Sequence, residues 1–248
     1  MKSKTIAFTI ADNNNLKYYE MLKNSWNKFH PDIELKLYGE AEIKSFSDPM
    51  FFYRATPIVG KQLLDEGYEI VIKIDADSIV TANLSHTWDS NFDVAVVQNS
   101  NPKEAKTYPV AVWDIPPMAY VNCGYVVMKS KGFVNHWLAL CMSHHFNNYQ
   151  MKEQDLLNIL VFYGGYNVNF LDSGDTFHGL ASKGYWQNIE LQDKDLVLPQ
   201  NMEWPQSGDK DIAIIHFAGG NDPAKGNYRT RFQDDVVKHL DWLVSDDK

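Results

Sequence analysis

The segment Glu69-Ile70-Val71-Ile72-Lys73-Ile74-Asp75-Ala76-Asp77-Ser78 decides how the rest of the chain is interpreted. An apolar run ends abruptly on two carboxylates one residue apart, Asp75 and Asp77. Runs of this kind are typical of strands buried on both faces of an α/β sheet, and ligands bind beyond the carboxyl ends of such strands. The segment therefore predicts a buried strand whose end can hold one divalent cation.

The segments on either side alternate between strand and helix patterns. Residues 4–10 have the pattern of a strand, residues 16–29 carry apolar side chains at helical spacing, and residues 33–38 alternate as a second strand. This opening predicts a parallel sheet with a right-handed crossover. A cap residue followed by proline predicts a short helical turn at residues 48–49 and a separate helix over residues 56–67.

The rest of the chain continues the alternation. Further strands are expected at 93–98, 121–128, 168–171, 195–198 and 211–216, and further helices at 132–145, 152–162 and 229–244. Residues 99–117 are predicted to form a loop over the site. The fold class is therefore α/β, with a mostly parallel central sheet flanked by helices. No linker or repeat divides the chain, so a single domain over residues 1–248 is predicted.

Composition narrows the possible functions. The 248 residues are 44% apolar and 22% charged with a net charge of −9, which indicates a globular protein and argues against a nucleic-acid partner. Two cysteines, Cys123 and Cys141, are too few for a metal knuckle or a disulfide framework and favour a reducing compartment. No segment has the apolar length of a transmembrane span, so a cytoplasmic location is expected.

Three residues at strand ends could bind a metal together. A lone Asp-X-Asp pair is usually a solvated turn, but Asp75 and Asp77 follow a buried strand, and His216 also ends an apolar strand. Two carboxylates and an imidazole favour Mn²⁺, with Mg²⁺ as the alternative, and such ions keep open positions for phosphates. Arg54 and Lys225 could neutralise a diphosphate, although each is more simply read as surface charge.

Several stretches resemble one enzyme family when they are taken together. They are Phe8 to Asn14, Asp75-Ala76-Asp77 preceded by Tyr53-Arg54, Asn122-Cys123-Gly124, Glu153 to Asn158, and His216-Phe217-Ala218-Gly219 followed by Lys225. In order and rough spacing they resemble glycosyltransferases of the GT-A fold, most closely glycosyltransferase family 8, which includes glycogenin and bacterial lipooligosaccharide galactosyltransferases. Two departures are Lys225, which comes later than in the family, and Glu153, which replaces an aspartate.

The resemblance implies a Rossmann-like GT-A fold, with a nucleotide-binding half over residues 1–100 and an acceptor-side half with a C-terminal helix over residues 101–248. It implies transfer of a hexose from UDP-glucose or UDP-galactose to a glycan or other hydroxyl acceptor, with retention of configuration. The implied metal ligands are Asp75, Asp77 and His216, and the implied catalytic residues are Gln154 and Asp155. The implied donor-binding residues are Ala11, Asp12, Asn13, Arg54, Asp75, Ala76, Asp77, Asn122, Gly124, Gly219 and Lys225.

Two other functional classes remain open at this point. A haloacid-dehalogenase-like phosphohydrolase also uses a strand-ending Asp-X-Asp, with Asp75 as nucleophile and Asp77 as acid/base, and would hydrolyse p-nitrophenyl phosphate. A non-catalytic sugar-nucleotide-binding module on the same fold would bind UDP and Mn²⁺ without turnover.

Overall fold

The structure is a computed structural model that describes residues 3–13, 15–44, 51–98, 115, 119–171, 189–198, 210–217, 228–230 and 232–246. The helices are α1 Leu16–Phe29, α2 Glu40–Lys44, α3 Phe51–Asp65, α4 Lys131–Cys141, α5 Glu153–Tyr163 and α7 Asp234–Val244, with 3₁₀ turns η1 Ser85–Thr87, η4 Phe146–Asn148 and η7 Tyr228–Thr230. The strands are β1 Thr5–Ile10, β2 Leu35–Tyr38, β3 Ile70–Ile74, β4 Ser78–Val80, β5 Val94–Gln98, β6 Val121–Met128, β7 Val168–Leu171, β8 Glu190–Gln192, β9 Asp195–Leu198, β10 Lys210–Asp211 and β11 Ile214–His216. Of the predicted features, the helical turn at residues 48–49, the 99–117 loop (apart from Ile115), Gly219 and Lys225 lie outside the described residues.

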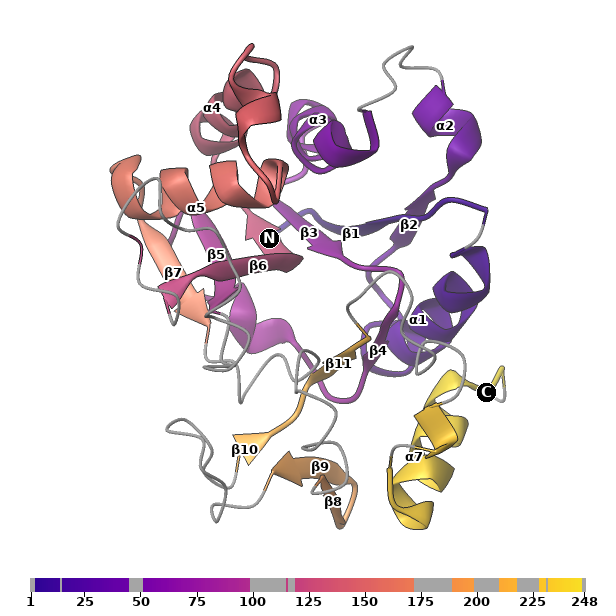
Figure 1. Cartoon of the computed structure of the whole chain (residues 1–248). Helices are drawn as coiled ribbons and strands as arrows, with labels where there is room; N and C mark the ends of the chain where they lie inside the picture. Colours follow the sequence, from indigo (N-terminus) through magenta and orange to yellow (C-terminus); the bar gives the residue numbers. More distant parts are fainter. Residues whose placement is uncertain are drawn as a thin grey trace.

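A six-stranded sheet in the order β2-β1-β3-β6-β5-β7 forms the centre of the fold (Figure 1). β1 pairs in parallel with β2 and β3, and β5 pairs in parallel with β7. Only β6 within this sheet runs the other way, antiparallel to both β3 and β5. The sheet is thus mostly parallel, as predicted, and it joins strands from both halves of the chain.

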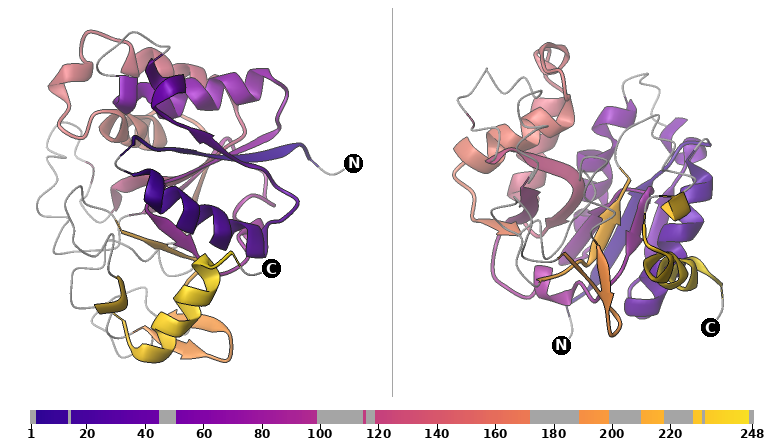
Figure 2. Two further views of the ribbon diagram at one scale, coloured as in Figure 1. Left: turned by 90° about the vertical axis from the view of Figure 1, so that its right-hand side faces the viewer. Right: turned by 60° about the horizontal axis from the view of Figure 1, so that its bottom comes forward.

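Each face of the sheet carries its own apolar core. The alternation of β3 explains the division, since Val71 packs with α3, α4 and α5 on one face, whereas Ile70, Ile72 and Ile74 pack with α1 on the other. α1 presents Leu22 and Trp26, one helical turn apart and both fully buried, to that second face. The left view of Figure 2 shows the sheet between these helical layers.

Two smaller sheets extend the fold beyond the carboxyl end of β3. β4 pairs antiparallel with β11, and β8, β9 and β10 form a three-stranded sheet in the order β10-β9-β8. α7 packs over this region through Val236, Leu240 and Leu243, which are completely buried. Among the described helices, none combines the length and hydropathy that a membrane span needs.

Several predicted boundaries were wrong. The predicted start of a helix at Pro57 was wrong, because Pro57 lies inside the continuous helix α3. Proline has no N–H to donate to the carbonyl of Tyr53, one turn earlier in the helix, and α3 tolerates this loss because Tyr53 is 44% exposed to solvent. The predicted strand 211–216 divides into β10 and β11, because the chain changes partner there: Ile212 N–H donates to Leu196 O, and Thr81 N–H donates to Ala213 O. The predicted helix 229–244 divides into η7 and α7.

Candidate metal centre

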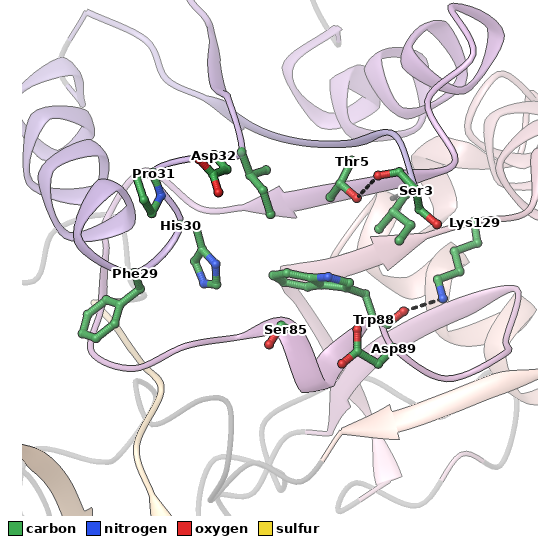
Figure 3. Close-up of a pocket in the computed structure, with 12 residues that line it drawn as sticks. Ser3, Thr5, Phe29, His30, Pro31, Asp32, Ser85, Trp88, Asp89 and Lys129 are labelled. Atoms are coloured by element: carbon green, nitrogen blue, oxygen red, sulfur yellow. Dashed lines mark hydrogen bonds between the residues drawn. The ribbon is translucent and has the colours of Figure 1, made fainter. Parts of the chain in front are cut away.

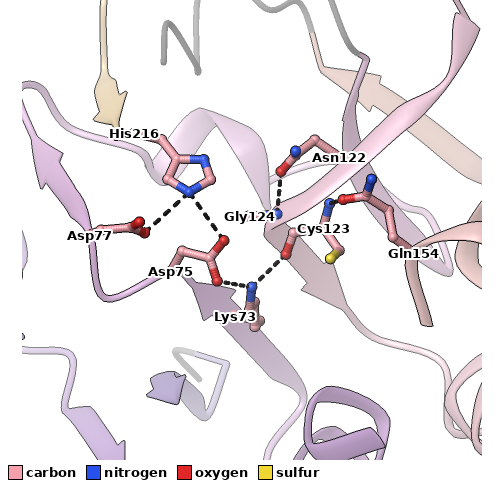
Figure 4. A network of polar contacts seen from close by, with 8 residues as sticks. All are labelled: Lys73, Asp75, Asp77, Asn122, Cys123, Gly124, Gln154 and His216. Carbon is pink, nitrogen blue, oxygen red and sulfur yellow. Dashed lines mark hydrogen bonds and ion pairs between the residues drawn. The ribbon is translucent and has the colours of Figure 1, made fainter. Parts of the chain in front are cut away.

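Asp75, Asp77 and His216 converge beyond the end of β3 (Figure 4). Each contributes one ligand atom, and these three atoms lie within 4.8 Å of one another. His216 Nε2 is 3.2 Å from Asp75 Oδ2 and 3.2 Å from Asp77 Oδ1. The predicted set of three side chains is therefore assembled in the structure, with two carboxylate oxygens and one imidazole nitrogen facing a common point.

The β4–β11 ribbon brings His216 to the carboxylates. Asp75 follows β3 directly, and Asp77 precedes β4, so the three-residue connection between these strands presents both side chains. In the ribbon His216 lies opposite Ser78, and the backbone N–H of Phe217 donates to the carbonyl of Asp77 over 2.9 Å. β4 was not predicted from the sequence, although Ser78-Ile79-Val80 continues the apolar pattern after the carboxylates.

Lys73 is a buried cation beside the centre that the sequence analysis did not single out. Its ammonium donates to Asp75 Oδ1 and, over 2.6 Å, to the carbonyl oxygen of Cys123, and its side chain is only 5% exposed. The pair occupies one oxygen of Asp75 and leaves Oδ2 directed at His216. The signal in the sequence was a single charge inside an otherwise apolar strand, which is costly unless the charge is paired.

The charges of the centre shift the protonation of its members. Burial disfavours a charged ring at His216, but the carboxylates of Asp77 and Asp75 outweigh burial and raise its pKa to about 9. Burial likewise disfavours a charged Asp75, but the Lys73 ammonium and the hydrogen bond from His216 hold the pKa of Asp75 well below its usual range. Without a cation, the protonated imidazole thus partly neutralises the two carboxylates.

Gly124 is a position where a side chain would not fit. A Cβ placed there would lie 2.6 Å from His216 Cε1 and 2.7 Å from Asn122 Oδ1. Asn122 Oδ1 already accepts the Gly124 N–H over 2.6 Å, and the Gly124 carbonyl accepts the Asp75 N–H over 2.8 Å. A register shift between Val96 and Val97 marks where β6 departs from β5. The predicted Asn-Cys-Gly segment therefore lies against the metal centre.

Gln154 and Asp155, predicted to be catalytic, belong to a buried polar network at the start of α5. Gln154 Oε1 accepts the Cys123 N–H over 3.1 Å, and its amide donates to the Tyr120 hydroxyl over 3.3 Å. Tyr120 donates in turn to Asp155 Oδ1 over 2.7 Å, and Asp155 Oδ2 accepts the Met151 N–H over 2.9 Å. Gln154 is thus tied to the segment beside the metal centre, whereas both Asp155 oxygens are engaged within the protein.

The other predicted donor-binding residues are spread over two places. Ala11, Asp12 and Asn13 follow β1, the strand beside β3, and so lie at the same edge of the sheet as Asp75. Asp12 Oδ1 accepts two hydrogen bonds from Asn15, which shapes this loop. Arg54 instead donates to the carbonyl of Cys141 over 2.8 Å and stacks on Phe146, so it joins α3 to the end of α4.

The composition of the centre fits a divalent cation. Hard carboxylate oxygens suit Mg²⁺ and Mn²⁺, and a borderline imidazole ligand moves the preference toward Mn²⁺. The other oxygen of Asp75, Oδ1, is held by Lys73, and a contact of this kind orients a ligating carboxylate. Ala76, between the two carboxylates, is 5% exposed and anchors their turn in the interior.

Comparisons with known proteins identify the fold. No protein-family profile matches the sequence, and none of the curated proteins matches it. The solved structure of an active-site mutant of LgtC superposes with a TM-score of 0.64 at 17% identity, covering 96% of this chain and 94% of LgtC. LgtC with donor and acceptor sugar analogues, described as a galactosyltransferase, gives 0.56 at 16% identity, covering 97% and 95%.

The bifunctional glycosyltransferase WbbM, solved in its apo form, gives a TM-score of 0.62 at 15% identity. It covers 99% of this chain, which spans about half (50%) of WbbM. At identities this low, the structural similarity establishes the fold alone, and the substrate has to be inferred from the residues of the site. As its motifs predicted, the chain has the GT-A fold, which it shares with glycosyltransferases that include LgtC and WbbM.

Proposed function

We propose that the protein is a metal-dependent glycosyltransferase that moves a hexose from a UDP-sugar, UDP-glucose or UDP-galactose, to a glycan or other hydroxyl acceptor. The observation that carries this proposal is the Asp75–Asp77–His216 cluster at the carboxyl edge of a GT-A sheet. Its ligand atoms lie within 4.8 Å of one another, as a shared Mn²⁺ or Mg²⁺ would require.

The residues around the cluster suit the charges of the reaction. Breaking the bond between a sugar and a nucleotide diphosphate leaves negative charge on the diphosphate, and a cation held by Asp75, Asp77 and His216 would stabilise that charge. Lys73 adds a fixed positive charge beside Asp75 Oδ1, the oxygen that does not face His216. A group that is already in place when charge develops lowers the barrier, because it need not reorganise during the reaction.

The donor sugar is assigned to the face formed by Asn122, Gly124 and Gln154. Gly124 lets His216 and Asn122 approach the backbone closely on this face, and Gln154 is held against the backbone of Cys123 within the same bend of β6. The loop after β1, with Ala11, Asp12 and Asn13, is assigned to the nucleotide base. Retention of configuration, inferred from the family resemblance, requires no strong catalytic base, which agrees with the engagement of both Asp155 oxygens.

The two alternative classes are separable from this proposal. A phosphohydrolase would need an accessible Asp75 nucleophile, but Lys73 holds one oxygen of Asp75 and His216 lies beside the other. A non-catalytic module would bind UDP and Mn²⁺ and release no product. Hydrolysis of p-nitrophenyl phosphate without binding of a UDP-sugar would support the first class.

The decisive experiment measures Mn²⁺-dependent hydrolysis of UDP-glucose and UDP-galactose by the unmodified protein and by Asp77→Asn. We expect the substitution to abolish release of UDP and to leave the melting temperature of the metal-free protein close to its original value. Asp193→Asn is a matched control, because Asp193 is exposed in the β8–β9 turn at φ 56°, a conformation that asparagine tolerates. Equal activity in Asp77→Asn and Asp193→Asn would refute the metal assignment.

A further inference from the structure

The strand β7 forms one edge of the central sheet, and no strand among the described residues pairs with its outer side (Figure 1). On its inner side β7 runs parallel to β5, where the carbonyl oxygen of Asn167 accepts the N–H of Val94. Backbone groups alternate in direction along a strand, so the next residue to bond to β5 is Asn169. The N–H and carbonyl groups of Val168 and Phe170 therefore point away from the sheet.

The other edge strands of the central and three-stranded sheets carry charged side chains, a common protection against unwanted strand pairing. Lys36 lies in β2, at the opposite edge of the central sheet, and Glu190 and Lys210 lie in β8 and β10, the two edges of the smaller sheet. No charged residue occurs in β7 or anywhere in residues 156–171. Of these edge strands, β7 is thus the one without a charge that would oppose pairing.

Apolar side chains accompany the outward backbone groups of β7. Phe170 is 41% exposed, and its ring stacks on that of Phe162 in α5 with the centroids 5.6 Å apart. Val168, two residues earlier, lies on the same face of the sheet and is half-buried against the core beneath α5. The edge therefore combines hydrogen-bonding groups with an aromatic and a β-branched side chain that a further strand could cover.

Charge is distributed unevenly between this edge and the rest of the molecule. The chain has a net charge of −9, but residues 115–171 contain three lysines and two carboxylates, Glu153 and Asp155. Elsewhere even a hollow of the surface is acidic, since Asp32 and Asp89 line the cavity beside the start of β1 (Figure 3). Two copies of an acidic protein repel each other least where acidic groups are scarce, and β7 lies on such a side.

We propose that β7 is a dimer interface, where it pairs antiparallel with β7 of a second copy of this chain. A two-fold axis at Asn169 places Val168 opposite Phe170 of the second copy, and the reverse. Each such pair exchanges two backbone hydrogen bonds through its outward groups, and sets an aromatic ring beside a β-branched side chain. The edge is complementary to itself in both respects, which favours a second copy over an unrelated strand. The interface is independent of the proposed transfer reaction.

Sedimentation equilibrium of the full chain, without metal or nucleotide, measures this association. We expect the mass to rise with concentration from that of the chain, 28.5 kDa, toward twice that value. Phe170→Lys should weaken the association about tenfold or more, because a symmetric dimer contains the change twice. Phe52→Lys is the matched control, since Phe52 is 46% exposed in α3 and belongs to no strand, and it should leave the association unchanged.

A mixture of two variants tests the register of the paired strands. Val168→Glu alone should weaken the association, as Phe170→Lys does, whereas an equal mixture of the two variants should restore it. In the mixed dimer the new glutamate of one copy faces the new lysine of the other, and the second pair remains Phe170 with Val168. Thermal melts of each variant alone check that it folds.

Hydrogen exchange of the unmodified protein gives a readout that needs no substitution. The backbone amides of Val168 and Phe170 should exchange more slowly as the protein concentration rises, because they become bonded to the second copy. The amide of Lys36, in the edge strand β2, should exchange at a constant rate. Rates at Val168 and Phe170 that do not depend on concentration would contradict the proposed pairing.

Three further results would overturn the proposal. One is a protein that stays monomeric up to about 100 µM, which excludes a dissociation constant in the micromolar range. Another is an association that Phe170→Lys leaves unchanged, or that Phe52→Lys weakens equally, since the contact would then lie on another surface. A third is a monomer that binds vesicles of phosphatidylglycerol through this edge, which would make a lipid surface its occupant.

Discussion

Replacing Gly124 by alanine tests whether the metal centre requires a residue without a side chain at this position. The new Cβ would lie 2.6 Å from His216 Cε1, so the ring would have to withdraw by about 0.8 Å to reach an ordinary contact of 3.4 Å. His216 Nε2 now lies 3.2 Å from each carboxylate, and displacement of the ring takes it out of line with them. Changes beside a metal ligand typically weaken metal affinity about 10–100-fold, and we expect a loss of that size.

The assay is titration of Mn²⁺ followed by electron paramagnetic resonance of the free ion. Gly132→Ala in α4 is the matched control, because its Cβ would meet only Ser130 Oγ at 3.5 Å, an ordinary contact. If the effect acts through His216, then adding Gly124→Ala to His216→Ala should cause little further loss. Parent-like Mn²⁺ affinity in Gly124→Ala, or full additivity in the double variant, would refute the reasoning.

Three further outcomes are expected from urea denaturation of the metal-free protein. Because the folded pKa of His216 is raised to about 9, its protonated ring stabilises the fold below pH 6.5, and this contribution, of order 3 kcal/mol, is lost as the pH rises toward 9. Lys73→Met should lower the free energy of unfolding by about 3 kcal/mol, since it leaves Asp75 without its buried partner. Tyr120→Phe should lower it by roughly 1.5–3 kcal/mol, because the hydroxyl donates to the Asp155 carboxylate.

Each of these outcomes has its own check. In His216→Ala the loss of stability between pH 6.5 and 9 should disappear, and an unchanged pH profile would contradict the assignment. Lys61→Met is the control for Lys73→Met, because Lys61 pairs with Asp65 on the exposed surface of α3, where ion pairs contribute under about 1 kcal/mol. Equal effects of the two lysine variants would contradict the role given to Lys73, and a neutral Tyr120→Phe would contradict that of the α5 network.

The strands and helices with strong local patterns could be predicted from the sequence. The bounds of α1 and β7 matched the prediction, and β3 ends where the carboxylates begin. These segments are predictable because their periodicity is set by burial on one or both faces of the sheet. Continuity of α3 through Pro57 was not predictable in this way, because packing of Ala55, Val59 and Leu63 in the interior outweighed the local breaker.

The convergence of the three candidate ligands could be predicted from the sequence, whereas the residues that support them were harder to predict. Asp75, Asp77 and His216 each end an apolar segment, and that shared feature marked them. The three-residue strand β4 is too short to show a period, so the ribbon that aligns His216 with Ser78 could not be read locally. Lys73 was missed although one partner, Asp75, lies two residues away, because its other partner, the Cys123 carbonyl, is 50 residues away and is a backbone group that leaves no mark in a sequence.

The β4–β11 ribbon also bears on when the candidate metal centre can first form. Asp77 and His216 are 139 positions apart in the chain (216 minus 77), and β11 can pair with β4 only after the chain has been synthesised as far as His216. A nascent chain that ends before His216 therefore has two of the three ligands and binds a cation weakly. Cation binding then stabilises the finished fold in preference to its precursors, by mass action. In this way the order of synthesis prevents the candidate metal centre from forming before the chain has been made as far as His216.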